Sequence, residues 1–283
     1  MPKIKNKRAQ LFTLIAIALI GFMFISFELF SFVGQRQTVK SRISTMEGFL
    51  DSVEKNLERQ MFISGFRIIF LAEDKTTRTG EYISDVDGFF NEAFFNGTVN
   101  SQENEILNGA TYDAFVTSIN DKAKKINVEI SLKNPRVFVS QDDPWHVKFT
   151  LVSDFVMEDK SGLAKWEKQQ NISAFIPIER FEDPMYVINT NARVSRKINQ
   201  TAFEGNYVVG NDISNLLSHL EKGYYAANPN APSFLNRLNG NFSADENGIE
   251  SFVNTVQLLQ QGLSVYEKTN IDYIYFSSSS PVS

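Results

Sequence analysis

Residues 11–33 read LFTLIAIALIGFMFISFELFSFV, a run of 23 residues in which Glu28 carries the only charge. An α-helix rises about 1.5 Å per residue, so roughly 20 apolar residues cross the hydrocarbon core of a bilayer. A secretory signal peptide has a shorter apolar stretch of about 7–15 residues, followed by a small-residue cleavage site. The run is longer than that and no A-x-A site follows it. We therefore expect residues 10–33 to form a transmembrane helix, with a buried core helix as the alternative.

The flanks of this run suggest an orientation. Residues 1–9 contain four basic side chains and no acid, and the opposite flank contains three basic side chains, Arg36, Lys40 and Arg42. Short basic segments stay in the cytoplasm by the positive-inside rule. We expect residues 1–9 to be a basic cytoplasmic leader. The 250 residues after the run would then lie outside the cytoplasm, on a single-pass protein of the cell membrane.

Composition excludes several classes of protein. The chain has 283 residues, of which 42% are hydrophobic and 22% charged, which is typical of a folded protein. It has no cysteine, so disulfides, thiolate metal sites and a cysteine nucleophile are excluded. A formal charge of −5 argues against nucleic acid as a partner. No phosphate-binding, nucleophile-elbow or zinc-protease motif is present, and we expect no catalytic, cofactor-binding or metal-binding residues.

Residues 34–75 are expected to continue the helix as a stalk. Apolar side chains recur there at spacings of four and three, the heptad pattern of a helix with one apolar stripe, at Val39, Ile43, Met46, Leu50, Val53 and Leu57. The stripe widens after Leu57, and we expect the helix to end near Leu71, before a polar break at residues 72–81. The stripe packs either on the chain's own globular domain or on a second copy as a coiled coil.

Residues 76–185 are expected to form an α+β ectodomain. Helical periodicity is present at residues 85–95 and 111–125. The apolar period then changes from 3.6 to 2, which predicts four consecutive strands: residues 126–132, residues 137–139, a strand from residue 146 to 158, and a return strand after the turn at residues 159–162. Short links between strands predict an antiparallel meander packed on the first helix.

Residues 186–283 are expected to be a mostly helical C-terminal part of the ectodomain. Helices are predicted at residues 212–225 and 248–263, a short helical or turn segment at residues 233–238, and a closing strand at residues 271–276. His219 is expected on the flank of the first of these helices, partly buried. The acidic cluster Glu179, Glu182 and Asp183 lacks the looped array of oxygens that calcium requires.

The junction Lys7-Arg8-Ala9-Gln10-Leu11-Phe12-Thr13-Leu14 resembles the class III signal peptide of archaeal type IV pilin-like proteins. In that family a prepilin-type peptidase cuts after a short basic leader and the apolar helix stays on the mature protein. The resemblance implies cleavage between Ala9 and Gln10, with Arg8 before the cut. Many members carry Glu at the fifth mature position, where this chain has Leu14. An uncut single-pass anchor is the alternative.

The resemblance implies a membrane-anchored surface protein with a structural, adhesive or assembly role. Its partners would be the lipid bilayer, a prepilin-type peptidase and other pilin-like subunits. A membrane-tethered extracytoplasmic enzyme or ligand-binding protein remains the alternative, with a cleft between the meander and the C-terminal helices. Of the four N-x-S/T sequons, those at Asn96 and Asn241 lie in predicted loops and are candidate glycosylation sites.

Overall fold

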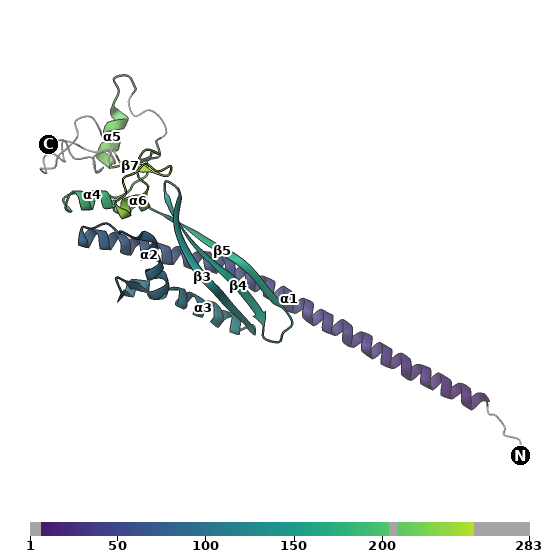
Figure 1. Cartoon of the computed structure of the whole chain (residues 1–283). Helices are drawn as coiled ribbons and strands as arrows, with labels where there is room; N and C mark the ends of the chain where they lie inside the picture. The colour runs from purple at the N-terminus through teal and green to yellow at the C-terminus, as the bar shows by residue number, and fades with distance from the viewer. Residues whose placement is uncertain (1–6, 204–208, 252–283) are drawn as a thin grey trace, which may run out of the picture.

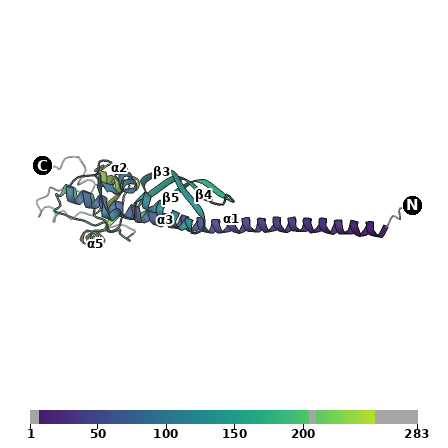
Figure 2. The same cartoon turned by 90° about the horizontal axis from the view of Figure 1, so that it is seen from below.

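The computed structural model describes residues 7–203 and 209–251, and side chains from residue 11 onward except Gln35. One helix, α1 (Lys7–Thr79), runs for 73 residues. Its first part stands free as a straight rod, and its second part lies along the folded domain (Figures 1 and 2). α1 is the one helix in the described part of the chain that is long and apolar enough to cross a membrane.

The domain is α+β, as expected. α1 is followed by α2 (Val86–Asn91), the π-helical turn η1 (Glu92–Asn96), the small hairpin β1 (Thr98–Val99) and β2 (Gln102–Glu103), the 3-10 turn η2 (Glu105–Leu107) and α3 (Tyr112–Lys124). Three long strands come next: β3 (Val128–Asp143), β4 (His146–Asp159) and β5 (Lys165–Pro177). The C-terminal part contains α4 (Pro184–Asn189), α5 (Ser214–Lys222), β6 (Tyr225–Ala227), α6 (Phe234–Asn239) and β7 (Ile249–Ser251).

The long strands form an antiparallel meander in the order β3-β4-β5. Along β4, Val147, Phe149 and Leu151 are fully buried, while the side chains between them are partly exposed. Phe149 contacts the rings of Phe90 and Phe94 from α2 and η1. One face of the sheet is therefore covered by helices and the other faces solvent, as in many antiparallel sheets.

The meander has three strands, so the expectation of four is wrong. Asn134-Pro135 does not end a strand; it is a bulge inside β3, where the register shifts between Lys133 and Arg136. Asn134 adopts a positive φ of 50°, and its side-chain amide donates to Asp154 on β4 at 2.8 Å. β3 is an edge strand, and an edge strand tolerates proline because one side of its backbone needs no ladder partner.

α1 also extends past the expected end at Leu71. Ala72 and Thr76 continue the buried stripe at four-residue spacing, and both are covered by the domain. Burial thus keeps the polar stretch from Glu73 onward helical. Gly80, with a φ of 67°, then ends the helix, and its N–H donates to the carbonyl of Thr76.

The stripe on α1 packs on the chain's own sheet, which was one of the two expected arrangements. Met46, Val53, Leu57 and Met61 are at most 3% exposed. The closest approach is at Gly65, where an added Cβ would lie 2.6 Å from Ile176 Cδ1 and 3.2 Å from a ring carbon of Phe149. Glycine allows the helix backbone to lie directly against β4 and β5 at this point.

The C-terminal part differs from expectation near its end. Residues 249–251 were expected in a helix but form β7, which pairs antiparallel with β6. The helix expected at residues 212–225 is present as the shorter α5, and Tyr225 begins β6 instead. The short segment expected at residues 233–238 forms α6. Leu217, expected to face inward, is 47% exposed. The rest of the helix expected at 248–263 and the strand expected at 271–276 lie outside the described residues.

Filling the close contact at Gly65 is expected to destabilise the domain. Gly65→Leu forces a large side chain against Ile176 and Phe149 and should lower the free energy of unfolding by about 1–3 kcal/mol. The measurement is urea unfolding of the full chain in detergent, followed by fluorescence of Trp145 and Trp166. The matched control is Gly48→Leu on the same helix, because nothing lies within 4 Å of a Cβ there. Equal losses in both variants would contradict the close packing at Gly65.

Candidate functional site

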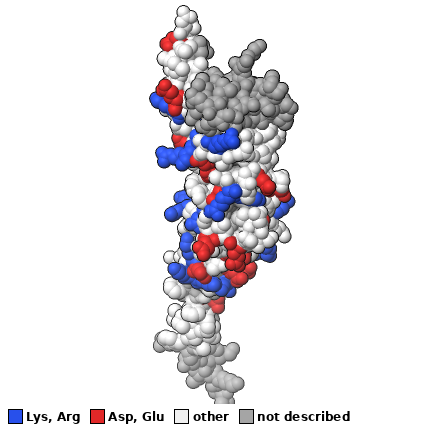
Figure 3. Space-filling model, turned by 90° about the vertical axis from the view of Figure 1, so that its left-hand side faces the viewer, with Lys and Arg blue, Asp and Glu red and all other residues white. Residues whose placement is uncertain are grey.

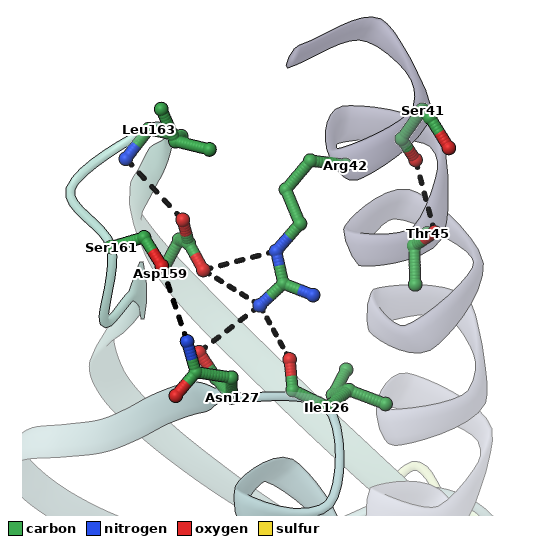
Figure 4. A network of polar contacts seen from close by, with 8 residues as sticks. All are labelled: Ser41, Arg42, Thr45, Ile126, Asn127, Asp159, Ser161 and Leu163. Carbon is green, nitrogen blue, oxygen red and sulfur yellow. Dashed lines mark hydrogen bonds and ion pairs between the residues drawn. The ribbon is translucent and has the colours of Figure 1, made fainter. Parts of the chain in front are cut away.

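The candidate site is the junction where α1 leaves the domain. Its centre is Arg42, which lies between two turns of the domain (Figure 4). The Arg42 guanidinium donates to Asp159 Oδ1 from Nε at 3.0 Å and from Nη2 at 2.6 Å. Nη2 also donates to the backbone carbonyls of Ile126 and Asn127. One side chain thus joins the helix to the α3–β3 turn and to the β4–β5 hairpin.

Local backbone geometry presents Asp159 to this arginine. Asp159 ends β4, and the turn that follows closes through Gly162, whose N–H donates to the Asp159 carbonyl at 2.8 Å and whose φ is 70°. The Leu163 N–H donates to the second carboxylate oxygen at 3.3 Å. Both carboxylate oxygens of this buried side chain therefore have donors.

The pKa of Asp159 is lowered. Its burial alone would raise the pKa, but the hydrogen bonds from Arg42 and from Leu163 N–H, together with the charge of Arg42, outweigh that effect. The carboxylate is therefore held in its charged form.

A shallow hollow of about 650 Å³ lies between the helix and the two turns. Its lining is mostly small and polar: Gly34, Gln37, Thr38, Ser41, Arg42, Thr45, Asn127, Ser161 and Leu163. The helix side of the hollow begins at Gly34, one residue after the apolar run. The tip of the β4–β5 hairpin therefore lies beside the start of the polar part of α1.

A second hollow, of about 510 Å³, lies on α1 itself and is lined by Phe32, Arg36, Val39, Lys40 and Ile43. The Arg36 guanidinium lies 4.5 Å from the centre of the Phe32 ring. Two cationic side chains therefore border an apolar surface directly at the end of the apolar run.

At the Gln141 end of the meander, the sheet and the described C-terminal residues make direct contacts, and an enzyme or ligand-binding role with a cleft in this region stays a prediction. The Gln141 side chain accepts from the Leu235 N–H at 3.3 Å, and Asn247 Nδ2 donates to the Gln141 carbonyl at 2.8 Å. A third hollow, of about 580 Å³, lies on the open face of the sheet near Lys160. A fourth, of about 440 Å³, lies beside Asp85, away from the sheet. None of these four hollows separates the meander from the C-terminal helices.

The leader residues and the candidate glycosylation residues lie far apart along the chain. Arg8, Ala9 and Gln10 fall in the first turns of α1. Asn96 is exposed at the end of η1, and Asn241 is exposed after α6. Nothing in the geometry tests cleavage or glycosylation, so both stay predictions.

The two histidines serve different contacts. His146 Nδ1 lies 2.9 Å from Asp143 in the β3–β4 turn. His219 is 5% exposed, more buried than its expected place on a helix flank. Its Nδ1 lies 2.6 Å from the Asn215 carbonyl and its Nε2 lies 2.6 Å from the Thr201 hydroxyl. This Thr–His pair lines none of the four hollows, and it holds α5 to the segment before it.

Asp183, in the acidic cluster at residues 179–183, is committed to protein contacts. Asp183 caps α4 by accepting from the Met185 N–H at 2.9 Å. Its second oxygen accepts from Arg237 at 2.6 Å and from the Tyr225 hydroxyl at 2.8 Å. Asp183 and Arg237 are both fully buried, so this ion pair is a structural centre of the C-terminal part. Among the described residues no group of three or more His, Asp or Glu side chains could hold a metal ion.

Glu73, near the end of α1, lies close to Glu182. Its carboxylate accepts from the Glu182 N–H at 3.0 Å. Burial raises the pKa of Glu73, and the charge of Glu182 acts in the same direction, while that N–H and Lys197 oppose the shift. This contact ties the far end of α1 to the C-terminal part.

Sequence reasoning treated Arg42 only as a flanking charge and Asp159 only as a turn residue. A signal was available, because Arg42 lies four residues before Met46 on the buried stripe of α1. A basic residue that begins a buried stripe needs an acceptor. The acid that supplies this acceptor is decided by how the β4–β5 hairpin lies against the helix.

Removing the junction arginine is expected to destabilise the domain. Arg42→Gln takes the donors away from the buried Asp159 and should lower the free energy of unfolding by about 2 kcal/mol. The free energy of unfolding is measured by urea unfolding of the full chain. The matched control is Arg78→Gln, whose ion pair with Asp74 on the same helix is exposed and should cost under about 1 kcal/mol. Equal losses would contradict a special role for Arg42.

The Asp159 carboxylate should also make the stability of the domain depend on pH. An acid whose pKa is lowered by folding contributes stability above its ordinary pKa, 3.8 for Asp159, and loses that contribution as the pH falls through the folded-state value. The stability difference between the wild type and Asp159→Asn should therefore shrink as the pH falls below about 3.8. Glu73, with its raised pKa, acts with the opposite sign but is present in both proteins. A difference that is constant from pH 7 to pH 2.5 would contradict the lowered pKa.

Comparison with protein-family models, with curated proteins and with solved structures found no match to this chain.

Proposed function

We propose that this chain is a single-pass, membrane-anchored, pilin-like protein of the cell surface with a structural, adhesive or assembly role. Residues 10–33 cross the membrane, residues 1–9 lie in the cytoplasm, and the domain from residue 34 onward lies outside. The class III-like leader is cut between Ala9 and Gln10, so that the apolar helix becomes the N-terminal part of the mature protein.

The observation that supports this proposal is the division of α1 into two parts. Every described side chain from residue 11 to residue 34 is exposed, although most are apolar. In Figure 3 the projection at the bottom of the view is mostly white, below a domain that carries both signs of charge, and Glu28 is the only charged residue between residues 11 and 34. From Met46 onward one face of the same helix is buried against the domain. A soluble monomer rarely leaves so large an apolar surface uncovered, and a bilayer covers it.

A second observation favours an assembly role. Phe62, Phe66 and Phe70 recur at four-residue spacing on the side of α1 that the sheet leaves open, and each is about 40% exposed, at 39%, 42% and 43%. The ring of Phe66 contacts the rings of Phe62 and Phe181, and these two neighbours help to hold it in position. Exposed aromatic rows of this kind are typical of contact surfaces for another protein chain.

The N-terminus of the protein purified from its native membrane tests the proposal. Intact-mass spectrometry should give a chain that starts at Gln10. Ala9→Phe should retain the leader, because the resemblance requires a small residue before the cut. Ala18→Phe, the same substitution inside the apolar run, should be cut normally. A wild-type chain that keeps the leader through Ala9 would overturn the pilin-like proposal and leave a plain anchored domain.

A further inference from the structure

The surface of the domain that faces the apolar part of α1 is made of three segments: residues 34–45 of the helix, residues 121–127 at the α3–β3 turn, and residues 158–165 at the β4–β5 hairpin. We call this surface the underside. Arg42 joins all three segments through Asp159 and the carbonyls of Ile126 and Asn127 (Figure 4). The underside is therefore one connected surface at the foot of the domain.

Its height above the apolar run matches the polar layer of a bilayer. That layer is about 5–8 Å thick on each side of a hydrocarbon core of about 30 Å. Thr38 lies five residues after Val33, which is about 7–8 Å along a helix. Ser161 and Leu163 of the hairpin share a hollow with Gly34, Gln37 and Thr38. If residues 10–33 cross the membrane, the hairpin tip lies at the level of the lipid headgroups.

The net charge of the underside is opposite in sign to that of the rest of the sequence after position 45. Its three segments contain eight basic and three acidic residues, and the remaining residues after position 45 contain sixteen basic and twenty-nine acidic residues. The net charges are therefore +5 and −13. A basic surface of this kind is attracted to anionic lipid headgroups.

The side chains that produce this charge are accessible. Lys124, Lys125, Lys160 and Lys165 are exposed. Lys124 and Lys165 make only exposed ion pairs, with Asp121 at 3.3 Å and Glu167 at 3.0 Å, and such pairs exchange readily for phosphate. Of the three acids, Asp159 is buried and already neutralised by Arg42.

Leu163 completes the pattern. It is 44% exposed at the hairpin tip, between Lys160 and Lys165. An apolar side chain flanked by lysines is the composition of a segment that lies in the membrane interface, with the cations near phosphates and the apolar group at the acyl boundary. The second hollow, with Arg36 and Lys40 beside Phe32, presents the same combination on α1.

We propose that the underside binds the anionic headgroups of the membrane that α1 crosses, with Leu163 in the interface. This inference rests on the proposed anchoring. The contact holds the domain at a set angle on the membrane, so that α1 does not act as a free stalk. A second copy of the chain is the competing occupant, and the experiment separates it from lipid.

The test uses the full chain in vesicles of phosphatidylcholine, with and without phosphatidylglycerol. The chain has no native cysteine, so Leu163→Cys gives a single site for an environment-sensitive fluorophore, and Ala244→Cys gives a matched site after α6. With phosphatidylglycerol the label at 163 should shift to shorter wavelength and be quenched by spin-labelled lipid. The label at 244 should do neither. High salt should reverse the shift at 163, because it screens exposed charges.

Charge reversal provides the second arm. Replacing Lys124, Lys125, Lys160 and Lys165 by Glu should abolish the shift at 163. The matched control reverses four exposed basic residues elsewhere and should keep the shift: Lys55, Arg78, Arg180 and Lys222. Unfolding in urea is measured for both quadruple variants to show that they fold.

Each outcome decides the proposal. A label at 163 that reports water in both kinds of vesicle overturns the lipid contact. A shift that survives the underside reversal also overturns it, because the four lysines would then not hold the surface to the lipid. A shift that depends on the ratio of protein to lipid indicates contact between copies and also overturns it. Resistance of the chain to carbonate extraction is measured on the same vesicles. If carbonate extracts the chain from the vesicles, the anchoring itself is overturned. If the chain resists extraction but the label at 163 shows no shift, only the lipid contact is overturned.

Discussion

The rest of the structure depends on one contact, the packing of α1 against β4 and β5. At Gly65 the helix backbone lies directly on Ile176 and Phe149, and the buried stripe extends from there in both directions, to Met46 and to Thr76. The sheet has one apolar face and must cover it, and α1, α2 and α3 supply that cover. Because the same helix continues beyond the sheet, the contact also determines where the apolar run points.

The boundary between the two parts of α1 is marked by charge. The hydrophobic effect holds the helix to the sheet from Met46 onward, and before that residue the stripe has little to pack against. Arg42 lies at this boundary and replaces apolar packing with hydrogen bonds to Asp159 and two turn carbonyls. The hydrogen bonds that a partly buried arginine makes to several acceptors are directional, whereas apolar packing is not. The hairpin and the α3–β3 turn are therefore positioned at a defined point along the helix.

The C-terminal part is organised differently, around a buried ion pair instead of a sheet. Asp183 caps α4 and accepts from Arg237 of α6 and from Tyr225 of β6. Three short elements that could not bury enough apolar surface alone are thus joined through one carboxylate. Glu73 connects this unit to the end of α1, and Gln141 connects it to the tip of the meander. The two ends of the domain, one basic and one centred on this ion pair, are separated by the length of the sheet (Figure 1).

The sequence by itself determined the elements whose periodicity is long and regular: the apolar run, the stripe from Met46 to Leu57, α3, and the alternation of β4 and β5. In these segments each residue's local preference and its burial agree, so the pattern can be read without knowing the partners.

Tertiary structure decided the rest. It made Asn134-Pro135 a bulge instead of a strand end, because the edge of the sheet tolerates an unpaired backbone, and it kept residues 72–79 helical, because Ala72 and Thr76 are covered. It paired residues 249–251 with β6, which helical spacing did not show. It also chose Asp159 as the partner of Arg42, 117 positions away along the chain. Such a contact depends on how two separately folded segments lie against each other, and no local pattern in the chain encodes that arrangement.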